Sequence, residues 1–190
     1  MARPLSEEKR HALLTAAANE VASTGIAAST IKIAKNAGVA EGTLFVYFPT
    51  KDELLNQLYL YLKSDLISFL ANDYPTNVSI EKQIEYIWTR YLDWGASNPN
   101  KRRALSQLNV SEKITMDIQN AAEIMFENLQ NVVANAMKEG ILREQPIYFL
   151  GEIINSLADM VLEMTFRNPE KLLEYKVLGW KALWGAIAHK

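Results

Sequence analysis

The side chains whose types and spacing most clearly suggest a chemical role lie in a short segment that ends at Pro49. Thr43, Val46 and Tyr47 are spaced by three and four residues, so in a helix they share one face. A face of hydroxyl and apolar groups is costly on a free surface, but it suits the major groove of DNA. There hydroxyl groups bond to base edges or phosphates, and methyl groups contact thymine. The spacing therefore predicts a helix that reads DNA.

The opposite face of this helix is apolar and needs a partner. Leu44 and Phe48 are four residues apart and are expected to bury against Ile33 and Ala34 of a preceding short helix, with Phe45 between the two faces. Two short helices joined by a turn that contains glycine form a helix-turn-helix. An ordinary helical hairpin, whose exposed face another segment covers, would give the same periodicity. Both interpretations stay open on periodicity alone.

The residues around the two short helices fit contacts with the DNA backbone. Ser29 and Thr30 lie at the N-terminus of the first of them, where N–H groups favour a phosphate. Lys51 follows the second and is placed to reach a flanking phosphate. Gly42 has no side chain at the point where backbone and groove would approach each other closely.

Composition excludes most enzyme and metal chemistry. The 190 residues include no cysteine, which excludes disulfides, thiolate zinc sites and cysteine nucleophiles. The two histidines, His11 and His189, are near opposite ends, and the glycine motifs of nucleotide-binding loops and nucleophile elbows do not occur. We therefore expect no enzyme activity, no cofactor and no metal.

Charge and hydropathy point to a cytoplasmic protein. The first 51 residues carry six Lys or Arg and four Glu, whereas the other 139 carry fourteen basic and eighteen acidic residues. A mildly basic head before an acidic body permits local binding to nucleic acid. The start is acidic rather than apolar, and no apolar run approaches the ~20 residues that span a bilayer. We expect a soluble, cytoplasmic protein that does not contact a membrane.

Almost every segment has helical periodicity, so the expected fold class is all-α. Ser6 is expected to cap the first helix and Gly25 to end it, while Thr50 and Glu53 form a capping box that opens a long fourth helix. Further helices are expected at about residues 79–97, 99–109, 112–139, 146–166 and 170–188. The expected domains are residues 1–49, a three-helix DNA-binding domain, and residues 50–190, a helical bundle for ligand binding and dimerisation.

One stretch is very similar to a known signature. Residues 38–55 read GVAEGTLFVYFPTKDELL, which resembles the signature of the TetR family of one-component transcriptional repressors, and residues 25–37 fit the same pattern. The resemblance covers roughly the first third of the chain. Residues 88–95 and 110–113 support, less strongly, a similarity to the RamR-like repressors, which sense cationic drugs and bile-type amphiphiles and repress efflux functions.

The resemblance implies the DNA contacts residue by residue. Phe45 stands where the family commonly has Tyr, and Ile31 stands where a basic or polar residue is frequent, so two contacts differ here. The implied partner is double-stranded DNA with a palindromic operator. The predicted DNA-binding residues are Ser29, Thr30, Gly42, Thr43, Phe45, Val46, Tyr47 and Lys51.

The last two helices are apolar on two faces, and each face must be covered. A reader of a two-fold site needs a dimer that presents two recognition helices about 34 Å apart. Residues 146–188 are therefore expected to form a twofold four-helix interface of a homodimer. A fully enclosed bundle helix is the alternative explanation.

Aromatic residues in the central helices predict a pocket for flat amphiphiles or cations. The predicted ligand-binding residues are Tyr59, Lys63, Trp88, Tyr91, Phe126 and Ile154. The expected function is a ligand-responsive repressor, released from its operator by a small amphiphilic or cationic inducer, with efflux or stress genes as its targets. The alternative is a helical carrier of an apolar small molecule that never touches DNA.

Overall fold

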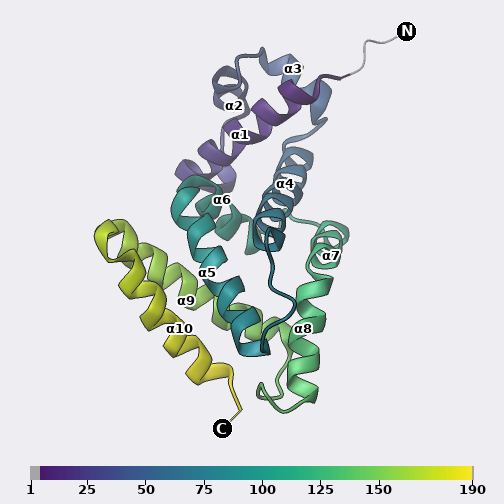
Figure 1. The fold of residues 1–190 in the computed structure, drawn as a ribbon. Helices are drawn as coiled ribbons and strands as arrows, with labels where there is room; N and C mark the ends of the chain where they lie inside the picture. The colour runs from purple at the N-terminus through teal and green to yellow at the C-terminus, as the bar shows by residue number, and fades with distance from the viewer. Residues whose placement is uncertain (1–4, 190) are drawn as a thin grey trace. The chain divides into compact units, whose positions relative to one another are not determined.

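The computed structural model describes residues 5–189, and over this range the protein is all-α, as predicted (Figure 1). Ten α-helices and two short 3₁₀ segments form two compact units. The first unit comprises the residues up to Asp65 together with Asn98–Ile124, and the second comprises Leu66–Ser97 together with the residues from Met125 onward.

The helices are divided between the units as follows. The first unit contains α1 (Glu7–Thr24), η1 (Gly25–Ala27), α2 (Thr30–Asn36), α3 (Glu41–Tyr47), most of α4 (Lys51–Ala71), α6 (Pro99–Asn109) and α7 (Met116–Met125) up to Ile124. The second contains the end of α4, α5 (Ile80–Ser97), α8 (Glu127–Lys138), α9 (Ile147–Arg167), η2 (Pro169–Lys171) and α10 (Leu172–Ile187). The predicted division after Pro49 falls between α3 and α4. The first compact unit is larger than residues 1–49 because α6 packs along α1.

The ends of α1 follow directly from its sequence. The Ser6 hydroxyl accepts a hydrogen bond from the Lys9 backbone N–H at 3.3 Å, and Glu7 and Glu8 occupy the first turn, where a negative charge is favourable. Gly25 ends the helix with a φ of 73°, which glycine adopts without strain. The inner side of α1 is buried against α2 and α6 through Leu13, Leu14, Ala17 and Val21.

Asn56 fastens the loop between α6 and α7 to α4. Its side chain is buried, and its amide nitrogen donates hydrogen bonds to the carbonyl oxygens of Asp52 (2.7 Å) and Lys113 (2.8 Å). Its amide oxygen accepts a hydrogen bond from the Thr115 backbone N–H at 3.0 Å. An amide side chain that satisfies three backbone groups of two segments holds both of them in register.

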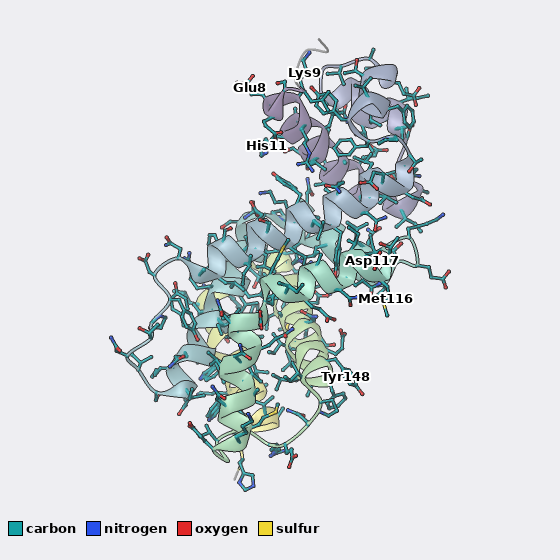
Figure 2. All side chains as sticks on the ribbon, turned by 90° about the vertical axis from the view of Figure 1, so that its right-hand side faces the viewer. Glu8, Lys9, His11, Met116, Asp117 and Tyr148 are labelled. Carbon is teal, nitrogen blue, oxygen red and sulfur yellow. The ribbon has the colours of Figure 1, made fainter. Side chains whose placement is uncertain are left out.

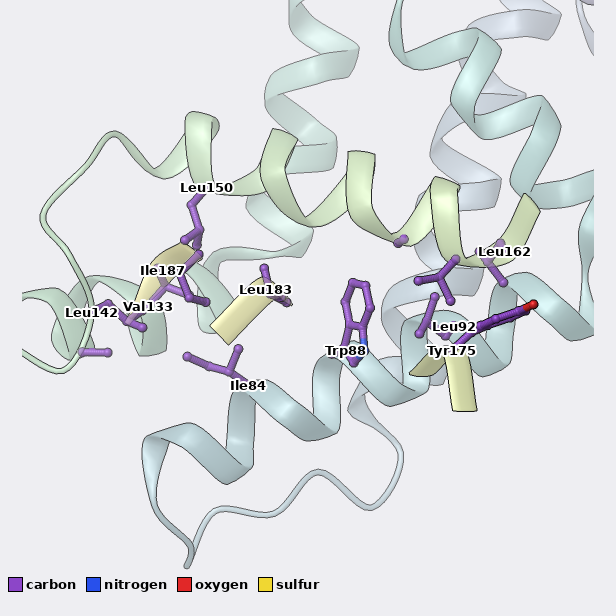
Figure 3. Close-up of a cluster of buried hydrophobic side chains, with 13 residues drawn as sticks. Ile84, Trp88, Leu92, Val133, Leu142, Leu150, Leu162, Tyr175, Leu183 and Ile187 are labelled. Atoms are coloured by element: carbon purple, nitrogen blue, oxygen red, sulfur yellow. The ribbon is translucent and has the colours of Figure 1, made fainter. Parts of the chain in front are cut away.

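The core of the second unit is built around Trp88 (Figure 3). The indole is only 1% exposed, and its Nε1–H donates a hydrogen bond of 3.0 Å to the carbonyl oxygen of Lys176 in α10. Gly179 makes room for the ring, because a Cβ at that position would lie 2.6 Å from Cζ2 of Trp88. The buried neighbours include Ile84, Leu92, Leu150, Val161, Leu162, Leu183 and Ile187.

A short antiparallel bridge ties the segment before α9 to the residues after α10. The backbone N–H of Arg143 donates to the carbonyl oxygen of Ile187, and that of His189 donates to the carbonyl oxygen of Ile141, each at 2.9 Å. Between residues 5 and 189, no helix combines the length and the hydropathy that crossing a membrane requires.

The single helix predicted over residues 112–139 is wrong. The chain makes turns up to Thr115, forms α7, and leaves helical geometry at Phe126 (φ −100°, ψ 4°) before α8. The predicted start at residue 112 fails because Asn56 of α4 binds the backbone groups of Lys113 and Thr115. The other four predicted helices of this half are confirmed to within two residues.

Candidate DNA-binding surface and ligand-binding residues

The exposed side of α3 is centred on two apolar residues. Leu44 and Phe48 are buried, as predicted, whereas Phe45 is 40% exposed and Val46 is 63% exposed. Gly42 is also exposed and lies three and four residues before them, so the three positions share one face. Among residues 5–65 and 98–124, no other segment covers this face.

Two details of the predicted outward face are corrected. Phe45 lies on the exposed side rather than between the two faces. Thr43 and Tyr47 are half-buried and flank the exposed centre instead of forming it. The Tyr47 side chain is held back because its hydroxyl oxygen accepts a hydrogen bond from the Ser6 backbone N–H at 3.0 Å.

Thr30 connects α2 to α3. Its hydroxyl donates a hydrogen bond of 2.7 Å to Oε1 of Glu41, the first residue of α3. Ser29 caps α2, and its hydroxyl oxygen accepts a hydrogen bond from the Lys32 backbone N–H at 3.4 Å. The sequence placed Ser29 and Thr30 together as phosphate contacts, whereas the structure commits the Thr30 hydroxyl proton to a carboxylate within the protein.

Gly42 lies near the start of α3 and Lys51 lies at the start of α4, and their DNA-binding roles stay predictions. A Cβ built on Gly42 would meet nothing within 4 Å, so the protein leaves open space at the start of the exposed face. Lys51 begins α4 directly after the turn that follows α3, and it is half-buried.

Basic side chains lie on the surface of the same unit. Lys9 is exposed on the first turn of α1, near Glu8 and His11 (Figure 2). Lys32 and Lys35 are exposed on α2, and the Lys32 ammonium lies 3.6 Å from a carboxylate oxygen of Glu20. Exposed cations near a helix-turn-helix favour an anionic partner.

A cavity of about 420 Å³ opens at the end of α3. Arg10 is the residue there that sequence reasoning missed: its guanidinium donates a hydrogen bond of 2.7 Å to Oε1 of Gln57 and lies 5.8 Å from the ring centre of Phe48. An arginine one turn into the first helix carries no pattern that distinguishes it from a solvated charge. The lining residues are Arg10, Tyr47, Phe48, Pro49, Thr50, Glu53 and Gln57.

Two predicted ligand-binding residues belong to the first unit. Tyr59 is 7% exposed, and the Lys63 ammonium lies 5.2 Å from the centre of its ring. Burial raises the pKa of the Tyr59 hydroxyl, and the negative charge of Glu123 raises that pKa further. The ammonium thus lies over the ring in a cation–π geometry.

The other four predicted ligand-binding residues belong to the second unit. Trp88 is enclosed in its core, and Ile154 packs against that core while partly exposed. Tyr91 stacks on Trp94 with ring centres 6.4 Å apart, and Phe126 is half-buried at the break between α7 and α8. None of the six predicted residues lines the 420 Å³ cavity or a second cavity of about 220 Å³ beside Thr15 and Asn98.

Over residues 5–189, no group of three or more His, Asp or Glu side chains is arranged to hold a metal ion.

Comparisons with known proteins agree with the helix-turn-helix geometry. Residues 13–58 match the family of bacterial regulatory proteins described as the tetR family. An uncharacterised HTH-type transcriptional regulator from Haemophilus influenzae is 29% identical over 163 residues, which is 82% of this chain and 84% of the relative.

Solved structures match over almost the whole chain. A tetR family transcription regulator from Shewanella sp. PV-4 is 25% identical with a TM-score of 0.86, covering 96% of this chain and 99% of its own. One from Marinobacter aquaeolei VT8 is 26% identical with a TM-score of 0.84, covering 97% of each chain.

Two regulators solved with bound small molecules share the fold. They are FadR from Bacillus subtilis with stearoyl-CoA (18% identical, TM-score 0.69, covering 92% of this chain and 97% of its own) and LfrR from Mycobacterium smegmatis with proflavine (18%, 0.70, 93% and 95%). The similarity to the RamR-like subgroup stays a prediction. The family match gives residues 13–58 the DNA-binding domain of the tetR family, and the full-length structural matches give the whole chain the fold of TetR-family transcription regulators.

Proposed function

We propose that this regulator is a repressor that inserts α3 into the major groove of its operator. The observation that carries the proposal is the exposure of Phe45 and Val46 on a helix whose opposite side is anchored by Leu44 and Phe48. An anchored helix with an uncovered face of this width matches the recognition helix of a helix-turn-helix. In this proposal residues 1–49 bind DNA, and residues 50–190 bind the ligand and the second subunit.

Contacts with the DNA backbone would come from around the two short helices. In this proposal Ser29 and Lys51 contact phosphates, and the exposed Lys32 and Lys35 add positive charge to the same unit. Thr30 would not contact a phosphate directly. It would support DNA binding by joining α2 to α3 through its hydrogen bond to Glu41.

The protein would act as a homodimer through residues 146–188. Apolar side chains exposed on α9 and α10 support this interface, among them Tyr148 at the first turn of α9 (Figure 2). The others are Ile147, Phe149, Met160, Met164, Phe166, Leu173, Val177 and Leu178. Covering them with a second copy would remove a large apolar area from water and would present two copies of α3 to a palindromic operator.

The inducer would be a small amphiphilic or cationic molecule. The related fold has been solved with stearoyl-CoA and with proflavine, which are molecules of these two kinds. α4 begins directly after the DNA-binding segment and carries Tyr59 and Lys63, so it is the lever through which a ligand would change the spacing of the two recognition helices. A coupling of about 1–3 kcal/mol would lower operator affinity 5- to 150-fold.

The DNA part is tested with the duplex upstream of the protein's own gene, by fluorescence anisotropy. Val46→Glu places a negative charge on the exposed face and should abolish specific binding. Val110→Glu, at a position 85% exposed at the end of α6, makes the same change elsewhere in the same unit and should leave binding intact. If the wild-type protein binds no duplex in preference to random DNA, the carrier interpretation replaces the repressor.

The ligand part is tested with proflavine and stearoyl-CoA as probes. A probe that binds the protein should weaken the complex with the operator. If a probe binds tightly and operator affinity does not change, α4 does not act as the lever, while the DNA-binding part of the proposal stands.

A further inference from the structure

We infer that the protein reads thymine methyl groups in its operator through Phe45 and Val46, an inference that rests on the proposed function. The inference specifies which chemical group of the bases α3 contacts. It follows from the side chains of α3 that are exposed and could reach a base.

The composition of α3 limits what it can read. The helix Glu41–Tyr47 carries the side chains of Glu, Thr, Leu, Phe, Val and Tyr, besides one glycine. Paired hydrogen bonds to guanine are made by Arg or Lys, and paired hydrogen bonds to adenine are made by Asn or Gln. α3 has none of these four residue types, so it cannot recognise a purine by a bidentate contact.

Two polar side chains of α3 already have hydrogen-bond partners within the protein. Glu41, which could accept a hydrogen bond from cytosine, already accepts one from the Thr30 hydroxyl at 2.7 Å. The Tyr47 hydroxyl accepts a hydrogen bond from the Ser6 backbone N–H at 3.0 Å, which directs the phenol toward the start of α1. Thr43 remains as a half-buried polar group beside the exposed face.

The exposed face is therefore apolar at its centre. Phe45 and Val46 have large, exposed side chains. Gly42, which precedes them in α3, leaves open space, because a Cβ there would meet nothing within 4 Å. Ile31 of α2, which is 63% exposed, adds another apolar group to the helix-turn-helix. The C5-methyl of thymine is the apolar group that base pairs display in the major groove, and apolar side chains recognise it by contact.

The positive charges around this face favour DNA over an apolar protein as its partner. Lys32 and Lys35 are exposed on α2, and Lys51 begins the next helix. An apolar strip beside exposed cations complements a groove floor of base edges bordered by phosphates. A purely apolar protein partner would leave those cations facing an uncharged surface.

The experiment uses the full-length protein and a duplex library with about 25 randomised base pairs, which is enough for two half-sites one helical turn apart. An enriched duplex is then resynthesised with deoxyuridine in place of each thymidine in turn, which removes one methyl group and keeps base pairing. Loss of one buried methyl contact should weaken binding about fourfold in a half-site, and about fifteenfold when both half-sites are changed.

Variants assign the methyl contacts to residues. Phe45→Ala and Val46→Ala should each weaken binding to the thymidine duplex. In at least one of the two variants, replacing thymidine by deoxyuridine at one position or more should no longer weaken binding. Val110→Ala, an equally small change on another exposed surface of the same unit, should preserve both the affinity and the deoxyuridine effect. A general loss of folding would not produce this base-by-residue pattern.

The outcomes separate the inference from the function on which it rests. A protein that enriches a specific duplex but tolerates deoxyuridine at every position overturns the thymine inference and leaves the repressor intact. A deoxyuridine effect that persists unchanged in both variants overturns it as well, because the methyl group is then read by another part of the protein or through DNA shape. Enrichment of no duplex by the folded protein rejects the repressor itself.

Discussion

The hydroxyl oxygen of Tyr47, the last residue of α3, lies 3.0 Å from the backbone nitrogen of Ser6, the residue that caps α1. This hydrogen bond joins positions 41 residues apart and fixes the end of α3 to the beginning of α1. The N–H of an N-cap residue has no partner within its own helix, so the phenol satisfies a group that would otherwise depend on water.

Tyr47→Phe should therefore loosen the start of α1 while the fold persists. We expect a loss of about 0.5–1.5 kcal/mol in operator affinity, the usual worth of a neutral hydrogen bond, because α3 is held less firmly. Amide hydrogen exchange reports the cause directly, since the Ser6 amide should exchange faster in the variant. Unchanged protection of Ser6 would show that the hydrogen bond does not persist in solution.

Thr30 and Glu41 should be coupled energetically. Thr30→Val keeps the shape of the side chain and removes its hydrogen bond to the carboxylate, so the free energy of unfolding should fall by about 1 kcal/mol for this partly exposed pair. Glu41→Ala, which removes the acceptor oxygen, should have a similar effect, and the double variant should lose less than the sum of the two. Urea unfolding of the four proteins gives the coupling energy, and simple additivity would contradict it.

The weakening of DNA binding by Thr30→Val should be the same for every sequence. The Thr30 hydroxyl joins α2 to α3 through Glu41, so we expect operator and random DNA to lose affinity by the same factor. A loss confined to one base pair of the operator would instead place Thr30 in direct contact with that base.

The helix-turn-helix was largely predictable from the sequence, and its tertiary hydrogen bonds were not. The spacing of Leu44 and Phe48 located the buried side of α3 because period and burial are linked directly. The positions of Thr43 and Tyr47 depend on partners far away in the chain, such as Ser6, and no local pattern encodes those partners.

Asn56→Ala should be among the more destabilising substitutions in α4. It removes the amide that satisfies the carbonyl of Lys113 and the N–H of Thr115, and leaving such groups unsatisfied costs about 1–3 kcal/mol each. We expect a loss of about 2–4 kcal/mol by urea unfolding. Ser64→Ala, on an exposed turn of the same helix, is the matched control and should change stability by less than about 0.5 kcal/mol.

Gly179→Ala and Gly185→Ala should have opposite effects on thermal unfolding, although both lie in α10. An added Cβ at Gly179 would lie 2.6 Å from Trp88 and 2.8 Å from Val161, so overpacking should cost about 1–3 kcal/mol. An added Cβ at Gly185 would meet nothing within 4 Å, and the better helix propensity of alanine should stabilise by about 0.5–1 kcal/mol. Equal melting temperatures for the two variants would refute the close packing of Gly179 on Trp88.

Tyr59 should make the protein less stable at alkaline pH. Burial and Glu123 raise the pKa of Tyr59 above 10.0 in the folded state, so the unfolded chain loses this proton first as pH increases. The contribution is complete below about pH 10 and is lost as pH rises through the folded-state pKa, with a slope of up to about 1.4 kcal/mol per pH unit.

Tyr59→Phe should accordingly show a shallower alkaline decline than the wild type in urea unfolding between about pH 9 and 11.5. Tyr61→Phe removes a partly exposed phenol of the same helix, outside the proposed dimer interface, and serves as the control. Parallel declines in the wild type and in Tyr59→Phe would contradict the raised pKa.

The ligand-binding residues show where sequence reasoning reached its limit. The aromatic content of the central helices is evident from composition, but whether a ring packs in a core or faces a ligand depends on what lies opposite it. Trp88 faces Gly179, which only the fold brings together with it, and its indole N–H is satisfied by a backbone carbonyl. A pattern of spacing along one helix contains no information about either partner.

The bridge between Arg143 and Ile187 has a practical consequence for anyone who modifies this protein. The backbone at the end of α10 is hydrogen-bonded to the strand-like segment that leads into α9. A tag or a truncation at this point is therefore expected to disturb both segments. Shortening the chain before Ile187 would release the entry to α9 as well as the tail itself, and a fusion partner is better joined at the opposite terminus or beyond His189.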